Sequence, residues 1–114
     1  MLKGLGALGD MAKMMKTAQE MQGKLAALQE ELGRKVVVGE AGGGIVKARV
    51  TAKGAVTGLD IDPSLLDPAQ KEVVEDLIIA AIREAQIRGN DLAQTEMARI
   101  AEEMGLPPGM GMPG

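Results

Sequence analysis

The sequence predicts an α+β fold in which a long helix, a three-stranded antiparallel sheet and a second long helix follow one another. Apolar residues recur at helical spacing over residues 11–32 and again over residues 74–104. Between these segments, residues 39–66 contain several glycines and an alternating stretch, and Asp62-Pro63 ends the strand pattern because proline cannot donate to a sheet. Three short strands need cover, so we expect the helices to lie across or extend beyond one sheet face.

The first helix is predicted to follow a flexible, glycine-rich N-terminus at residues 1–9. Asp10 is a candidate cap because its carboxylate can accept hydrogen bonds from free N–H groups of the first turn. A strict a/d heptad seam follows, and its members are Met11, Met14, Ala18, Met21, Leu25, Leu28 and Leu32. Two interpretations stay open: the seam packs within the chain, or part of it packs on another copy, since a 3.5-residue period is typical of helix–helix seams. Gly33 is the predicted helix stop.

Three strands are predicted at residues 34–38, 45–52 and 56–61, with a loop at residues 39–44 and a tight turn at Lys53-Gly54. Alternation in the second strand divides its side chains between two faces. Val46, Ala48, Val50 and Ala52 form an apolar face, which we expect to point inward, and Lys47, Arg49, Thr51 and Lys53 form a polar face.

The second helix has a clear predicted start at Asp67-Pro68-Ala69-Gln70, which offers a capping aspartate and a proline at the first helical position. Gly89-Asn90 predicts a bend or break, because glycine costs about 1 kcal/mol relative to alanine inside a helix. Gly105 and the prolines after it are expected to end the helix. We therefore expect one domain at residues 10–105 and a disordered tail at residues 106–114.

Composition argues against an enzyme. The 114 residues include no Cys, no His and no aromatic residue, which removes disulfides, thiolate metal sites and the usual general base. Ser64 is the only serine, so a Ser–His nucleophile is excluded. The loop Gly39–Gly44 lacks the Gly-Lys-Ser/Thr of a phosphate loop, and Asp60 and Asp62 are interpreted as part of a polar outer face. We expect no cofactor, no metal and no small-molecule substrate.

No apolar run approaches the ~20 residues of a membrane span, so the expected location is the cytoplasm and no membrane partner is predicted. The net charge of −3 hides an asymmetry: residues 1–54 carry +4 and residues 55–114 carry −7. The nine methionines and the absence of aromatic anchors predict a weakly specified core, for which oligomerisation is a natural remedy.

Basic residues of the first half are candidate phosphate contacts. Lys13 and Lys16 lie opposite the seam, and Lys24 lies beside it. Lys47, Arg49 and Lys53 share one strand face, although lysine also commonly protects exposed sheet faces and edges. Arg83, Arg88 and Arg99 stand among carboxylates and are interpreted as helix-surface ion pairs. The DNA-binding candidates are therefore Lys13, Lys16, Lys24, Lys47, Arg49 and Lys53.

Several segments, in order and spacing, are similar to one family. They are residues 14–22 (MMKTAQEMQ), 39–47 (GEAGGGIVK), 61–66 (IDPSLL), 75–85 (EDLIIAAIREA) and 106–109 (LPPG). Over residues 8–112 the chain resembles the YbaB/EbfC family of bacterial nucleoid-associated proteins. The resemblance implies a homodimer with helices projecting like tweezers from a sheet-based centre. It also implies binding to double-stranded DNA, nucleoid association and effects on gene expression. The alternative is a non-enzymatic protein-interaction module that uses the Met-rich seam and the acidic second helix.

Overall fold

The α+β prediction is confirmed by a computed structural model, which describes residues 2–105. The helices and strands are α1 (Leu2–Arg34), β1 (Val36–Ala41), β2 (Val46–Thr51), β3 (Val56–Ile61) and α2 (Lys71–Glu103). Short 3₁₀ turns occupy Gly42–Gly44, Pro63–Leu65 and Pro68–Gln70. The described residues divide into two compact units, residues 30–95 and residues 2–29 with 96–105.

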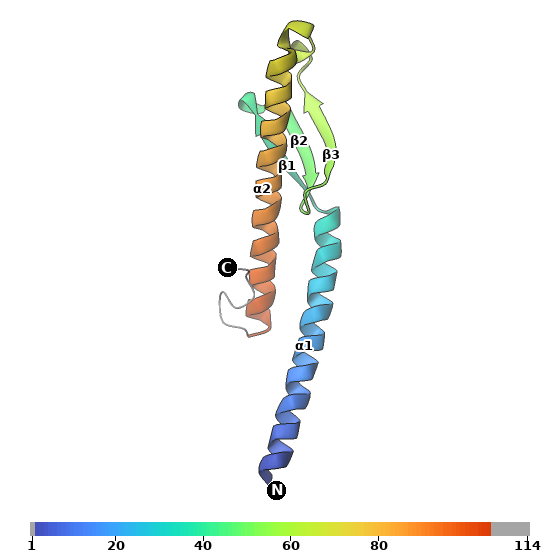
Figure 1. Ribbon diagram of the computed structural model, residues 1–114, viewed down its shortest axis with the longest axis vertical. Coiled ribbons are helices and arrows are strands. Elements are labelled where there is room, and N and C mark those ends of the chain that lie inside the picture. The colour runs from blue at the N-terminus through green and yellow to red at the C-terminus, as the bar shows by residue number, and fades with distance from the viewer. Residues whose placement is uncertain (1, 106–114) are drawn as a thin grey trace. The chain divides into compact units, whose positions relative to one another are not determined.

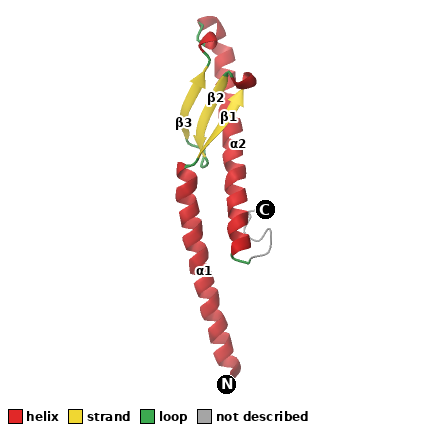
Figure 2. Ribbon diagram, turned by 180° about the vertical axis from the view of Figure 1, so that it is seen from behind, coloured by secondary structure: helices red, strands yellow, loops and turns green. Residues whose placement is uncertain are grey.

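The sheet, which lies in the unit of residues 30–95, is an antiparallel meander in the order β1-β2-β3 (Figure 2). Its register places Arg49 of β2 between Val38 of β1 and Gly58 of β3. The pairing between β2 and β3 is irregular at Arg49/Val50, where a β-bulge interrupts the ladder. The predicted turn is confirmed, because Gly54 adopts a φ of +99° and donates to the Thr51 carbonyl at 2.8 Å.

The core of this unit forms where α2 crosses one face of the sheet (Figure 1). Val46, Ala48 and Val50 are fully buried, as the alternation predicts. Ala81 and Ala85 of α2 are also fully buried against them, and larger side chains pack around this centre. Small residues on the helix therefore allow a close approach between α2 and β2. Thr51, expected on the polar face, is buried, and its hydroxyl accepts a hydrogen bond from the Ala55 N–H at 3.1 Å.

The predicted loop at residues 39–44 is wrong in its first half, because Gly39, Glu40 and Ala41 belong to β1. Gly39 is buried and pairs with Ala48. Its missing side chain leaves room for α2, so here glycine marks close packing rather than a turn. Gly42, Gly43 and Gly44 do form the turn, with φ values of +64°, +73° and +96°.

The predicted boundaries of α1 are also corrected. The helix begins at Leu2, so residues 2–9 are helical and Asp10 lies inside the helix rather than at its cap. Glycine weakens a helix by about 1 kcal/mol but does not interrupt its hydrogen bonds as proline would. At the other end, α1 includes Gly33 and ends at Arg34.

The predicted break at Gly89-Asn90 is wrong, because α2 is a continuous helix from Lys71 to Glu103. Gly89 is buried against Ala52: a β-carbon on Gly89 would lie 3.0 Å from the Ala52 Cα. The predicted capping role of Asp67 is confirmed, because its carboxylate accepts a hydrogen bond from the Ala69 N–H at 2.9 Å. The turn that it caps, Pro68–Gln70, is a 3₁₀ turn, and α2 itself begins at Lys71. Gly105 follows the helix with a φ of +73°.

None of the helices within residues 2–105 has the length and apolar character to cross a bilayer. The predicted tail, residues 106–114, lies outside the described residues. The domain limits at residues 10 and 105 remain a prediction.

Candidate nucleic-acid interface

Two candidate lysines on α1 have no carboxylate partner among the described residues. Lys13 and Lys16 are exposed, as are all residues from Gly6 to Glu20. Within the described part of the chain, neither ammonium forms an ion pair. Their positive charge is therefore available to an external anion.

Lys24, the third candidate on α1, is paired. Its Nζ donates to the Glu103 carboxylate of α2 at 3.0 Å, and both side chains are about half exposed. An exposed pair of this kind contributes only ~0–1 kcal/mol to stability. The pair nevertheless reduces the positive charge that Lys24 presents to an external anion. In this respect Lys24 differs from Lys13 and Lys16.

The basic cluster predicted on β2 is balanced by acidic residues on both neighbouring strands. Glu40 of β1 lies opposite Lys47, with Nζ and Oε1 3.9 Å apart. Arg49 extends over Gly58 and donates to the carboxylate of Asp60 on β3. The outer sheet face therefore presents two charge pairs instead of a basic patch.

Lys53, the last candidate, lies apart from this face, in the turn between β2 and β3. It is exposed, and its stem lies beside Gly33 at the end of α1. No carboxylate of residues 6–105 pairs with it. Arg34, the last residue of α1, is also exposed and pairs with no carboxylate of residues 6–105. It is absent from the sequence-based candidates, because the sequence pattern assigned it to the first strand.

The arginines of α2 largely follow the ion-pair interpretation. Arg88 pairs with Glu84 at 2.7 Å and also donates to the Val38 carbonyl at 2.9 Å. Arg99 pairs with Glu96. Arg83 forms no ion pair with another described residue, so the interpretation fails for it.

Asp60 and Asp62, interpreted from sequence as outer-face residues, have separate local roles. Asp60 pairs with Arg49. The Asp62 carboxylate caps the turn Pro63–Leu65 by accepting from the Ser64 N–H at 2.9 Å. Hydrogen bonds from the Ser64 hydroxyl and then from its backbone N–H lower the pKa of Asp62. No group of three or more Asp or Glu residues suited to a metal ion occurs within the described chain.

The heptad seam changes character along α1. Leu28 and Leu32 are buried, and Met21 and Leu25 are half-buried. Met11 and Met14 are 60% and 71% exposed, and Ala18 is exposed as well. Packing within the chain thus covers the C-terminal end of the seam and leaves its N-terminal end open. The intermolecular interpretation of that open end remains a prediction.

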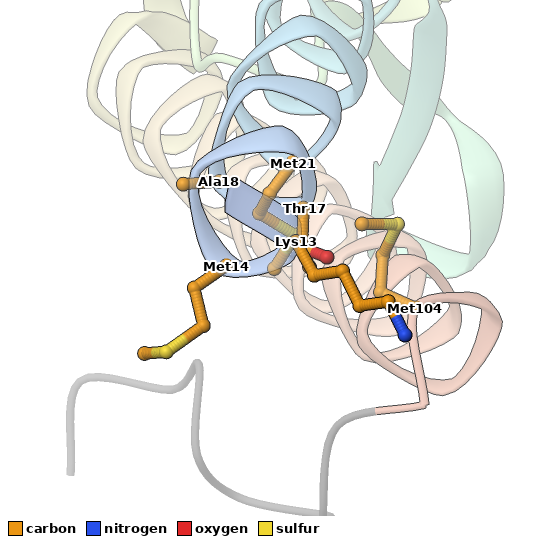
Figure 3. A pocket seen from close by; sticks show the side chains of 6 residues that line it. All are labelled: Lys13, Met14, Thr17, Ala18, Met21 and Met104. Carbon is orange, nitrogen blue, oxygen red and sulfur yellow. The ribbon is translucent and has the colours of Figure 1, made fainter. Parts of the chain in front are cut away.

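A shallow apolar hollow of about 410 Å³ lies in the unit of residues 2–29 and 96–105. Figure 3 shows its lining residues: Lys13, Met14, Thr17, Ala18 and Met21 from α1, and Met104 after the end of α2. Met104 could not be placed there from the sequence, because it is far from α1 along the chain. The hollow combines adaptable thioether side chains with the unpaired Lys13.

Residues 8–104 match the model of the YbaB/EbfC DNA-binding family. A nucleoid-associated protein of Bradyrhizobium is 45% identical over 91% of this chain and 98% of its own length. Another, from Desulfotalea psychrophila, is 39% identical over 86% of this chain and 92% of its own. A crystal structure of protein HP0035 from Helicobacter pylori is similar in fold, with a TM-score of 0.56 and 22% identity over 68% of this chain and 90% of that one. With its family model matched over most of its length, the chain belongs to the YbaB/EbfC DNA-binding family.

Proposed function

We propose that this protein binds double-stranded DNA as a homodimer, mainly through phosphate contacts and with little base readout. The family description names DNA binding, and the relatives from Bradyrhizobium and Nitrobacter hamburgensis are named nucleoid-associated proteins. The proposed location is the nucleoid within the cytoplasm, and the proposed role is non-enzymatic: organisation of the chromosome, with effects on gene expression.

The observation that carries the DNA contact is that Lys13 and Lys16 on α1 are exposed and have no carboxylate partner within the described part of the chain. They are three residues apart, a spacing that places helical side chains on neighbouring positions of one surface. Of the other candidates, Lys24, Lys47 and Arg49 already have carboxylate partners. No carboxylate of residues 6–105 pairs with Lys53, but it lies in the other unit, residues 30–95, so it remains a secondary candidate.

The electrostatics favour weak binding that depends strongly on salt. The chain is net acidic, and only its first 54 residues carry excess positive charge. Non-specific DNA affinities are typically ~10⁻⁴ to 10⁻⁶ M, and log K falls by about 0.9 per decade of salt for each phosphate neutralised. Two lysines per protomer therefore imply about four such contacts in a dimer if all of them engage.

For the dimer contact, the outer face of the sheet is the surface we favour. Val36 and Val38 of β1 are 48% and 38% exposed there. On the same face, the pairs Glu40–Lys47 and Arg49–Asp60 already match each charge with its opposite. A second copy could cover this face without burying an unpaired charge, which would be costly. A two-fold axis would place the same patch on both sides of the contact.

Gel-shift titrations across salt concentrations test the DNA proposal. The double variant Lys13→Gln/Lys16→Gln should bind duplex DNA more weakly, with a salt slope that is shallower by about 0.9 for each lost contact. The matched control is Lys24→Gln/Lys47→Gln, which removes the same charge from lysines that are already paired. Equal loss of affinity in both variants would show that only net charge matters, and no binding by the wild type at low salt would reject the proposal.

A second function is favoured by the open end of the seam. Leu8, Met11, Met14 and Met15 are each at least 60% exposed on α1, which is a large apolar surface for two helical turns. Such a stripe suits a protein partner, so the chain could serve as an interaction module. Pull-downs with and without nuclease distinguish the two functions, because partners held through DNA are lost when the DNA is digested.

A further inference from the structure

Three thioether side chains form an exposed group on α1. Met11, Met14 and Met15 are 60%, 71% and 64% exposed. Their spacing of i, i+3 and i+4 places them side by side on a helix. Every residue from Gly6 to Glu20 is exposed, so no described part of the chain shields this group from solvent.

The other described methionines have a different environment. Met21, Met97 and Met104 are half-buried, and this burial distinguishes them from Met14, although Met14, Met21 and Met104 all line the apolar hollow of Figure 3. The chain also lacks Cys, His, Tyr and Trp. Oxidants that would attack a thiol elsewhere therefore meet thioethers here, and their access depends on exposure.

We propose that Met11, Met14 and Met15 form a preferential oxidation site, at which a two-electron oxygen donor of the peroxide class converts each thioether to a sulfoxide. In each step the sulfur attacks one peroxide oxygen, an S–O bond forms and the O–O bond breaks. Sulfur loses two electrons and the peroxide gains them. With hydrogen peroxide, the departing oxygen takes up a proton and the sulfur-bound hydroxyl loses one, so one water is released for each sulfoxide formed.

The reaction changes the chemistry of a defined surface. A sulfoxide is polar and accepts hydrogen bonds, whereas a thioether is apolar and adaptable. The stripe of Leu8, Met11, Met14 and Met15 would thus lose most of its apolar character. The sheet core would be untouched, because its buried centre consists of valine, alanine and leucine. Reduction of the sulfoxide restores the thioether, so the change is reversible.

The test is a time course with limiting hydrogen peroxide on the full chain, in which mass-spectrometric fragmentation locates each added oxygen. Met11, Met14 and Met15 should oxidise several-fold faster than Met21, Met97 and Met104. In urea the six rates should converge, because the difference arises from burial. Equal rates in the folded protein, or faster reaction at the half-buried group, would overturn the proposal.

Two triple variants complete the test. Met11→Leu/Met14→Leu/Met15→Leu keeps a good helix former at each position and should lose the fast phase of oxygen uptake, measured over residues 2–105 so that Met1, Met110 and Met112 do not contribute. Met21→Leu/Met97→Leu/Met104→Leu should retain the fast phase. Oxidised wild type should elute earlier than the reduced protein from a hydrophobic-interaction column, and a methionine sulfoxide reductase should reverse the shift. Retention of the fast phase in the first variant, or unchanged elution of oxidised wild type, would contradict the assignment.

Discussion

Gly39 of β1 lies directly against the backbone of Ala81 on α2. A β-carbon built on Gly39 would come within 2.2 Å of the Ala81 carbonyl oxygen and 2.4 Å of the Ala85 nitrogen. Both contacts are to backbone atoms, which cannot move aside as the end of a flexible side chain can. The distance between the helix and the sheet at this point is therefore set by the absence of a side chain on Gly39.

The variant Gly39→Ala should destabilise the fold. Overpacking in a core typically costs about 1–3 kcal/mol, and a backbone neighbour leaves little room for relaxation. Urea denaturation followed by circular dichroism would measure the change. Gly23→Ala is the matched control, because a β-carbon there meets nothing within 4 Å and should stabilise α1 by about 0.5–1 kcal/mol. Similar midpoints for Gly39→Ala and wild type would contradict the close approach.

Gly89→Ala separates two opposing effects at one helical position. Alanine favours a helix by about 1 kcal/mol over glycine. At Gly89, however, the new β-carbon would lie 3.0 Å from the Ala52 Cα and 3.2 Å from its carbonyl oxygen. We expect Gly89→Ala to be less stable than Gly23→Ala in the same urea assay. An equal gain in stability in both variants would mean that the backbone at Ala52, in the turn before β3, shifts at little cost to make room for the new β-carbon on α2.

These glycines show where sequence reasoning succeeds and where it fails. The helical and alternating periods located both helices and the sheet, because periodicity records which side chains are buried. The roles of Gly39 and Gly89 depend on a neighbour distant in sequence. Glycine at either position is compatible with a turn, a break or a close contact, and only the packing of α2 on β1 and Ala52 distinguishes them.

The candidate interface shows the same limit. Alternation correctly placed Lys47 and Arg49 on the exposed face of β2, but the partners of their charges depend on strand register. The antiparallel pairing brings Glu40 and Asp60 to the two sides of Lys47, and Arg49 reaches Asp60 over Gly58. A shift of one residue in the register would have left a basic patch.

Glu103→Gln should strengthen DNA binding if the ion pair with Glu103 keeps Lys24 from contacting a phosphate. The substitution removes the carboxylate of α2 that lies 3.0 Å from the Lys24 ammonium, and it changes no residue of α1. One additional phosphate contact would steepen the slope of log K against log salt by about 0.9 per protomer. Gel shifts at several salt concentrations would measure it.

The control for Glu103→Gln is the same substitution in a Lys24→Gln background. A double-mutant cycle isolates the interaction between the two side chains, because effects that arise elsewhere cancel. We expect the gain in DNA affinity to disappear when Lys24 is absent. A gain of equal size in both backgrounds would attribute it to the lower negative charge of α2 alone.

Val38→Glu should dissociate the proposed homodimer. Val38 is 38% exposed on the outer sheet face, and a carboxylate there would be buried without a partner at a sheet-to-sheet contact. Sedimentation equilibrium should give about twice 11.8 kDa for wild type and a monomer for the variant. Met14→Glu is the control, because it places the same charge on the open end of the seam. Dissociation by Met14→Glu alone would move the dimer contact to α1.

Ser64→Ala should raise the pKa of Asp62 towards the ordinary value of an aspartate. The Ser64 hydroxyl and then its backbone N–H hold that pKa low, and the substitution removes only the hydroxyl. A carboxyl-detected NMR titration would follow Asp62 directly. An unchanged Asp62 titration would show that the backbone N–H alone lowers the pKa.

The sign of the effect on stability follows from the lowered pKa of Asp62 in the folded chain. The capping interaction stabilises the fold fully above the ordinary aspartate pKa and is lost as pH falls through the lowered folded value. Ser64→Ala should therefore narrow the acidic range over which stability changes, while Asp62→Asn should remove this contribution to the pH dependence. Urea midpoints measured at a series of acidic pH values would separate the variants. If wild type and Asp62→Asn lost stability in parallel as the pH fell, the Asp62 carboxylate would have no part in the acid sensitivity of the unit of residues 30–95.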